Sequence, residues 1–249
     1  MRQGAFLAAM LIGLTVGGSF AAAQVPLPRN APGQRPSATV PSAPAQAQAQ
    51  AAPTVRAPSM PSRPGPGGFD ANQRSLVDRV SMYLSSMNVL SGKFVQVGPD
   101  GSRTRGDFYM QKPGKVRFEY DSPSVIDIIA DGSSVVVRDR KLATQDVFPL
   151  SQTPLRFLLS DRIDLMRDTN VVGVYSDDVF STVVIEERQP LVGTSRLMLM
   201  FGAKDLQLKQ WTITDAQGYD TTVAVYNLDA TRRPDPSLFR ITYESMVKP

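Results

Sequence analysis

A succession of short strand-like segments separated by turn signals most constrains how this chain can fold. Residues 89–97 lead through the turn at 98–101 (GPDG) into residues 103–111, and the Lys-Pro-Gly turn at 112–114 leads into residues 115–120. Segments of the same kind follow at 125–131, 133–139, 144–150, 171–176, 180–188, 195–202, 208–215 and 219–228. Strands joined by such short turns pair antiparallel. The pattern predicts a meandering antiparallel sheet of about ten strands, a number that usually curls into a barrel or half-barrel.

A helix is expected before the first strand. Its apolar positions follow helical spacing and are Leu76, Val80, Tyr83, Leu84 and Met87. Asp70 or Asn72 could cap its start, because both side chains accept hydrogen bonds from the first free N–H groups of a helix. The resulting apolar stripe must pack on another apolar surface.

Residues 153–168 predict a second helical element between two strands. Thr153 is a suitable N-cap and Pro154 suits the first helical position. The apolar residues at helical spacing are Leu155, Leu158, Leu159, Ile163 and Met166. Two short amphipathic helices over one curled sheet would form a lid.

The first 23 residues have the features of a secretory signal peptide. Arg2 supplies a short positive region, residues 5–16 are apolar, and Ala21-Ala22-Ala23 resembles a cleavage site. The apolar run is shorter than the roughly 20 residues that a membrane-spanning helix needs. We therefore expect export, a soluble mature protein, and a folded domain at residues 69–249.

Between these regions, residues 24–68 hold 11 of the 20 prolines and no aromatic residue. Such a composition cannot bury enough apolar surface to offset its ordering entropy, so we expect a disordered tail with polyproline-II character. Two interpretations are open. The tail could be a flexible spacer, or its four arginines could tether it weakly to anionic lipid headgroups.

The distribution of charge argues against a nucleic-acid-binding domain. The formal net charge is +4, but residues 1–68 contain five arginines and no acidic residue. The rest of the chain has 22 basic against 23 acidic residues. A nearly neutral domain argues against the basic face that nucleic-acid binding requires and leaves only a local basic patch open.

Missing residue types exclude most catalytic chemistry. The chain has no histidine and no cysteine, so imidazole-dependent triads, thiolate metal sites and disulfides are unavailable. Without a cysteine the protein cannot itself be lipid-anchored as a bacterial lipoprotein is. Asp161, Asp164 and Asp168 share a helical face, but basic neighbours favour a solvated surface. We expect no enzyme, no metal and no cofactor.

One strand is apolar on both faces. In residues 195–201, Leu197, Leu199 and Phe201 point one way, whereas Met198 and Met200 point the other. A strand with two apolar faces is covered on both. Methionine suits surfaces that must fit variable ligands, although its common role is to fill gaps in a core.

Taken in order, the motifs of the domain resemble those of the periplasmic outer-membrane lipoprotein carrier family, LolA. The matching pieces are Phe94-Val95-Gln96, Gly106-Asp107-Phe108-Tyr109, Lys112-Pro113, Phe118-Glu119-Tyr120, Pro123, Ala130-Asp131-Gly132, Thr153-Pro154-Leu155, Trp211-Thr212-Ile213, Asp215, Gly218 and Asp235-Pro236-Ser237-Leu238-Phe239. No single piece is specific. Their order and spacing between residues 72 and 241 carry the resemblance.

The resemblance implies a mainly β fold: an open, incomplete antiparallel β-barrel, apolar inside, with helices as a lid. It implies a monomeric periplasmic chaperone that takes acylated lipoproteins from an inner-membrane ABC transporter (LolCDE-like). The carrier would bury the acyl chains and deliver the cargo to a receptor in the outer membrane. The alternatives are a sensor of the same fold that binds a membrane-bound regulator, and a carrier of another lipid or amphiphile.

Two positions depart from the family pattern. In this family an arginine before the hairpin proline latches the lid through hydrogen bonds, and here that position is Lys112. A lysine lacks the planar donor fork of arginine, so we expect a weaker or differently arranged latch. Alternatively, Lys112 is an ordinary charged residue that leaves the sheet at the turn. Val116 stands where a phenylalanine is frequent, which would widen the cavity.

Alternation along the strands and the lid stripe select candidate cavity residues. Those on the sheet are Phe94, Phe108, Met110, Val116, Phe118, Met198, Met200 and Trp211, with the odd-numbered neighbours of the two methionines as alternatives. Those on the lid are Leu155, Leu158 and Leu159. Ordinary core packing is the competing interpretation for each, because alternation gives the face of a strand and not its occupant.

Overall fold

A computed structural model describes residues 68–189 and 193–242. The predicted signal peptide and all but the last residue of the predicted proline-rich tail lie outside these ranges. Among the described residues, no helix has the length and apolar character to span a membrane.

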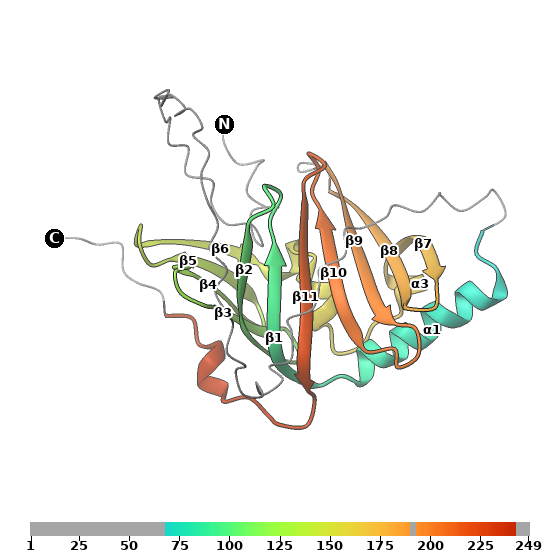
Figure 1. Ribbon diagram of the computed structural model, residues 1–249, viewed down its shortest axis with the longest axis horizontal. Coiled ribbons are helices and arrows are strands. Elements are labelled where there is room, and N and C mark those ends of the chain that lie inside the picture. The colour runs from blue at the N-terminus through green and yellow to red at the C-terminus, as the bar shows by residue number, and fades with distance from the viewer. Residues whose placement is uncertain (1–67, 190–192, 243–249) are drawn as a thin grey trace, which may run out of the picture. The chain divides into compact units, whose positions relative to one another are not determined.

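The fold is one open antiparallel sheet of eleven strands, with short helices (Figure 1). The strands are β1 (Val89–Val97), β2 (Arg103–Gln111), β3 (Lys115–Tyr120), β4 (Ile126–Asp131), β5 (Ser134–Asp139), β6 (Thr144–Pro149), β7 (Asn170–Ser176), β8 (Phe180–Gln189), β9 (Gly193–Gly202), β10 (Leu208–Thr214) and β11 (Asp220–Asp229). Their order in the sheet is β6-β5-β4-β3-β2-β1-β11-β10-β9-β8-β7. In the part of the chain that the structure describes, β6 and β7 remain unjoined edges. The predicted half-barrel architecture is thus confirmed, with eleven strands.

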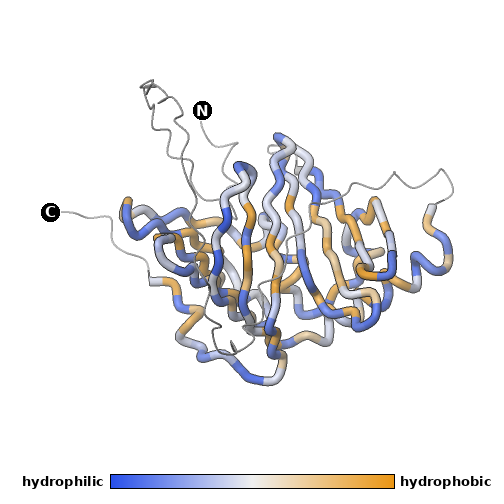
Figure 2. Tube along the Cα trace, viewed as in Figure 1, coloured by the Kyte–Doolittle hydropathy of each residue, from blue (hydrophilic) through white to orange (hydrophobic). Residues whose placement is uncertain are grey.

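Each half of the sheet is a meander of consecutive strands, and β1 joins β11 at the middle. Register pairs Phe94 with Gly106 on one side and with Val225 on the other. In β3 alternate residues are buried, as a sheet with one covered face requires. Figure 2 shows the result as apolar stretches along the strands and hydrophilic residues concentrated at the turns.

The first helix, α1 (Ala71–Ser86), follows the sequence prediction closely. Asp70 caps it: its carboxylate accepts from the Gln73 backbone N–H at 2.8 Å, and the Gln73 side chain accepts from the Asp70 N–H at 2.9 Å. The Gln73 side chain also donates to the Val174 carbonyl of β7 at 3.1 Å. The helix packs against β7 and buries its apolar stripe. It therefore covers one of the two sheet edges.

The helix predicted over residues 153–168 is wrong in extent. The structure has a 3-10 turn, η2 (Leu150–Gln152), and two separate helices, α2 (Leu155–Leu159) and α3 (Leu165–Asp168). Thr153 is not an N-cap, because its hydroxyl donates back to the Leu150 carbonyl at 2.9 Å. The chain becomes extended at Ser160. Met166 is consequently 39% exposed, and Leu165 takes the buried place instead.

After β11 the chain crosses the outer face of the sheet. This segment contains a short 3-10 helix, η3 (Pro236–Phe239), which packs against β3 and β4. Arg117 donates to the Leu238 carbonyl at 3.4 Å, and Arg138 donates to the Thr242 carbonyl at 2.7 Å. Phe239 is buried beneath it. The outer face of the β3–β5 region is therefore covered by the chain itself.

Candidate functional site

The inner face of the sheet and the lid helices form one apolar cluster. Nine predicted cavity residues belong to it: Phe94, Phe108, Met110, Val116, Phe118, Trp211, Leu155, Leu158 and Leu159. The α1 residues Leu76, Val77, Val80 and Leu84 join the same cluster. Strand alternation and helical spacing thus predict its membership well.

Aromatic rings occupy the centre of this cluster. Phe118 lies at the hub, with ring-centroid distances of 5.3 Å to Phe94, 6.1 Å to Phe108 and 6.3 Å to Trp211. Phe118 is on β3 and Trp211 on β10, with three strands between them in the sheet. Their contact therefore means that the sheet curls enough for its two halves to meet across the interior.

Met198 and Met200 do not belong to this cluster, which corrects their assignment to the cavity. They lie in a separate apolar group with Val184 on the opposite face of the sheet. The inner cluster takes their odd-numbered neighbours Leu197, Leu199 and Phe201 instead. Alternation separates the two faces of a strand, but it does not say which face is concave.

Lys112 lies where the β2–β3 turn meets the end of α1 and the end of α2. Its side chain is only 7% exposed, so it does not leave the sheet toward solvent at the turn. Its Nζ donates to the Leu84 carbonyl in the last turn of α1, where a cation also interacts favourably with the helix dipole. Its backbone N–H donates to the Asn88 carbonyl at 2.8 Å. The β2–β3 turn is thereby attached to the end of α1.

The same turn also holds α2. The Gly114 N–H donates to the Leu159 carbonyl at 2.9 Å, which satisfies one of the free carbonyls at the end of that helix. On its other side, Arg156 of α2 pairs with Glu187 of β8 at 2.7 Å. Polar contacts therefore anchor α2 to both halves of the sheet, whereas its apolar residues fill the space between them.

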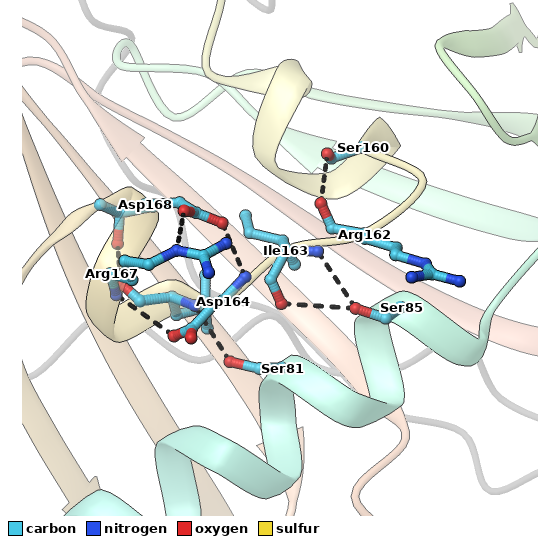
Figure 3. Close-up of polar contacts among 10 residues, drawn as sticks. Ser81, Ser85, Ser160, Arg162, Ile163, Asp164, Arg167 and Asp168 are labelled. Carbon is cyan, nitrogen blue, oxygen red and sulfur yellow. Dashed lines mark hydrogen bonds and ion pairs between the residues drawn. The ribbon is translucent and has the colours of Figure 1, made fainter.

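Two serines of α1 fasten the extended segment between α2 and α3 (Figure 3). The Ser85 hydroxyl accepts from the Ile163 N–H at 3.1 Å and donates to the Ile163 carbonyl at 3.3 Å. One turn earlier, the Ser81 hydroxyl accepts from the Leu165 N–H at 3.1 Å. The sequence reasoning missed these serines. Their spacing of four residues, on the buried stripe of a helix, is the signal that could have identified them.

Burial changes the proton affinity of Lys112. It lowers the pKa of the ammonium group from 10.5 to about 8, and the nearby Asp161 carboxylate opposes part of that decrease. Burial likewise raises the pKa of Tyr120, whose hydroxyl donates to the Gln96 side chain at 2.8 Å. Since an unfolded chain restores the ordinary pKa, both groups link folding to pH.

We expect Lys112 to make stability rise with pH between about 8 and 10.5. In that window the unfolded state binds the lysine proton and the folded state does not, so raising the pH favours folding. Relative to Lys112→Met, the wild-type free energy of unfolding should increase by up to about 3 kcal/mol across the window. Denaturant unfolding at several pH values measures this. Lys141→Met, at an exposed position, is the control. If the difference in unfolding free energy between the wild type and Lys112→Met does not change with pH, burial does not lower the pKa of Lys112.

Several charged residues line a cleft beside α1. A cleft of about 470 Å³ between α1 and the α2–α3 segment is lined by Asp161, Asp164, Arg167 and Asp168, among others. Within it Asp168 pairs with Arg167 at 2.9 Å, and Asp164 caps α3. The described residues contain no group of three acidic side chains that could hold a metal ion. Asp164 and Asp168 therefore have structural partners.

A family model matches most of the described chain. The model of the family described as outer membrane lipoprotein carrier protein LolA matches residues 85–242. The chain belongs to the LolA family. The match begins at the end of α1 and includes the eleven strands, Lys112, α2 and α3 of this LolA-family protein.

Two relatives are similar at low sequence identity. The outer-membrane lipoprotein carrier protein of Methylobacillus flagellatus is 24% identical over 179 residues, which cover 69% of this chain and 84% of the relative. That of Chromohalobacter salexigens is 27% identical over 176 residues, covering 67% and 81%. Both relatives have the same description as the matching family model.

Solved structures show weaker likeness. A LolA superfamily protein from Nitrosomonas europaea is 10% identical, with a TM-score of 0.38 over 66% of this chain and 97% of that one. A chain in the structure of the Pseudomonas aeruginosa MucA/MucB complex is 13% identical, with a TM-score of 0.38 over 69% of this chain and 62% of that one.

Proposed function

We propose that this LolA-family protein is a periplasmic chaperone that carries acylated lipoproteins from the inner to the outer membrane. One observation carries the proposal. The concave face of the sheet and the lid helices contribute to a single apolar cluster, and the lid is held over it by a few polar contacts around Lys112. A surface of this kind can exchange its lid contacts for acyl chains without chemistry.

The energetics support shielding as the task. Burial of an acyl chain contributes about 0.8 kcal/mol per CH₂ group. A lipoprotein with several acyl chains therefore needs a protein that shields them from water between the two membranes. The lid leucines now occupy the space that the chains would need. Ligand entry must therefore separate Leu155, Leu158 and Leu159 from the sheet. The net affinity is the gain from burying the chains minus the cost of opening the lid.

The proposed partners follow from the direction of transport. An inner-membrane ABC transporter of the LolCDE type would supply the cargo, and a receptor in the outer membrane would accept it. The predicted signal peptide at residues 1–23 would bring the protein to the periplasm, where it would act as a monomer. No step requires a cofactor, because the carrier only binds and releases.

A release assay tests this function. Purified mature protein, residues 24–249, is added to spheroplasts that synthesise a triacylated lipoprotein, and the soluble fraction is analysed for carrier-bound cargo. We expect the cargo in the soluble fraction. The same cargo with its acylated cysteine replaced by serine should not appear bound.

Absence of release, with a folded carrier and an active transporter, would contradict the proposal. Release of the serine cargo would also contradict it, because recognition would then not depend on acyl chains. Extraction of other lipids in place of lipoprotein would instead identify a carrier of a different amphiphile.

A further inference from the structure

The apolar interior changes character at one end of the sheet, where the β1–β2 and β10–β11 turns lie (Figure 1). There the inner face carries Gln96, Thr104 and Thr221, with Trp211 and Tyr120 beside them. Register places Thr104 opposite Gln96, Gln96 opposite Val223, and Val223 opposite Trp211. Thr221 is the next inward position of β11 after Val223. Five polar or amphipathic side chains from five strands thus share one patch of the concave face.

Three polar atoms of this patch are buried without a hydrogen-bond partner. They are the Thr104 hydroxyl, the Thr221 hydroxyl and the Trp211 indole N–H. Thr221 is 1% exposed and Trp211 is 3% exposed. Over nine-tenths of buried polar groups in proteins find a partner, and leaving one without costs about 1–3 kcal/mol. Three such atoms on one patch therefore need a common explanation.

The opposite face of the same strands provides a contrast. There Thr212 and Thr222 are buried to a similar degree, and their hydroxyls bond to each other at 2.9 Å. The two outer-face threonines thus satisfy each other, whereas Thr104 of β2 and Thr221 of β11, which β1 separates on the inner face, have no partner. The polar atoms without a hydrogen-bond partner therefore lie on the inner face, where the proposed function places a ligand.

The chemistry of the three atoms specifies what would satisfy them. An indole N–H can only donate, and a hydroxyl can donate as well as accept, so the missing group must be an acceptor. The five residues of the patch are uncharged. Burying an anionic phosphate or carboxylate beside them would cost several kcal/mol. A neutral carbonyl is the acceptor that fits.

We propose that Thr104, Thr221 and Trp211 form a polar subsite that binds the ester or amide carbonyls by which acyl chains are attached to a carried ligand. The inference rests on the proposed carrier function and adds to it. It means that the interior recognises the carbonyl linkage as well as the hydrocarbon of its ligand.

A matched pair of lipids tests the subsite. Dioctanoylglycerol has two ester carbonyls, and its diether counterpart, dioctylglycerol, has the same chain length without them. Two additional hydrogen bonds should make the ester bind about tenfold more tightly than the diether. Trp211 is the only tryptophan of the chain, so its fluorescence reports binding directly. We expect the ester to shift the emission to longer wavelength than the diether does.

Variants assign the effect to residues. Thr221→Val keeps the shape and removes the hydroxyl, and Trp211→Phe removes the indole donor; each should reduce the preference for the ester several-fold. Affinity for these variants is measured by displacement of a fluorescent fatty acid. Thr212→Val on the outer face should keep the full preference. Thermal unfolding of Thr221→Val should show no loss of stability, because the hydroxyl it removes has no partner.

The outcomes separate the subsite from the carrier function. If the wild type binds both lipids equally, or if Thr221→Val and Trp211→Phe keep the full preference, the subsite is wrong and the carrier proposal stands. A large loss of stability in Thr221→Val would also overturn it, since the hydroxyl would then have a structural role. If neither lipid binds, the carrier proposal fails as well.

Discussion

Leu158→Glu should lower the affinity for an acylated ligand at least about tenfold while the sheet remains folded. Leu158 is 5% exposed on α2 and belongs to the apolar cluster that the lid forms with the concave face. A carboxylate at this position would have to be buried without a partner, at a cost of several kcal/mol, or keep the lid away from the sheet. In either case the lid could not close over hydrocarbon. Titration with a fluorescent fatty acid measures the change.

Leu142→Glu is the matched control for this change. Leu142 is 50% exposed in the turn after β5, so the same substitution introduces the same charge without burial. Its affinity should equal that of the wild type. If Leu158→Glu also binds normally, with an unchanged circular dichroism spectrum, α2 does not act as a lid.

Phe94→Ala should cost about 3–5 kcal/mol of unfolding free energy, the usual loss for a large aromatic residue in a core. Phe94 is fully buried, and its ring makes edge contacts with Phe118 at 5.3 Å and Tyr120 at 5.0 Å. It stands on β1, in the middle of the sheet, so its removal leaves a cavity where the two halves meet. The melting temperature should fall by about 10 °C.

Calorimetry or urea unfolding measures this loss. Met82→Ala is the control, because Met82 is 64% exposed on α1 and its truncation should change stability by less than about 0.5 kcal/mol. A loss below about 1 kcal/mol for Phe94→Ala would mean that the interior collapses easily around the gap. The aromatic hub would then not be the main stabilising contact.

The sequence predicts local features of this protein well. Alternation in residues 108–118 identifies the inward row, and Asp70 caps the helix that it was expected to cap. Both depend on a few neighbouring residues. The turn signals likewise separate the consecutive strands within each half of the sheet, because glycine allows a positive φ, proline fixes φ and aspartate accepts hydrogen bonds from nearby backbone N–H groups.

Features that depend on distant parts of the chain were not predictable in the same way. The apolar spacing of residues 153–168 favours one helix, but Ser81 and Ser85 of α1 bind the backbone of Ile163 and Leu165 and hold the middle of it extended. Met198 and Leu199 are equally apolar, and only the curl of the whole sheet decides which faces inward. For Lys112 the sequence left open a hydrogen bond to a helix end and a side chain that leaves the sheet at the turn, and in the structure its Nζ donates to the Leu84 carbonyl of α1.

The strand order has a mechanical consequence. The chain leaves the sheet at one edge, at Pro149 of β6, and re-enters at the other edge, at Asn170 of β7. The segment between these residues, which contains η2, α2 and α3, is the proposed lid. This segment has a fixed number of residues and connects the two edge strands of the half-barrel. A ligand that moves β6 and β7 apart would have to extend this connecting segment. The size of the ligand and the position of the proposed lid should therefore depend on each other.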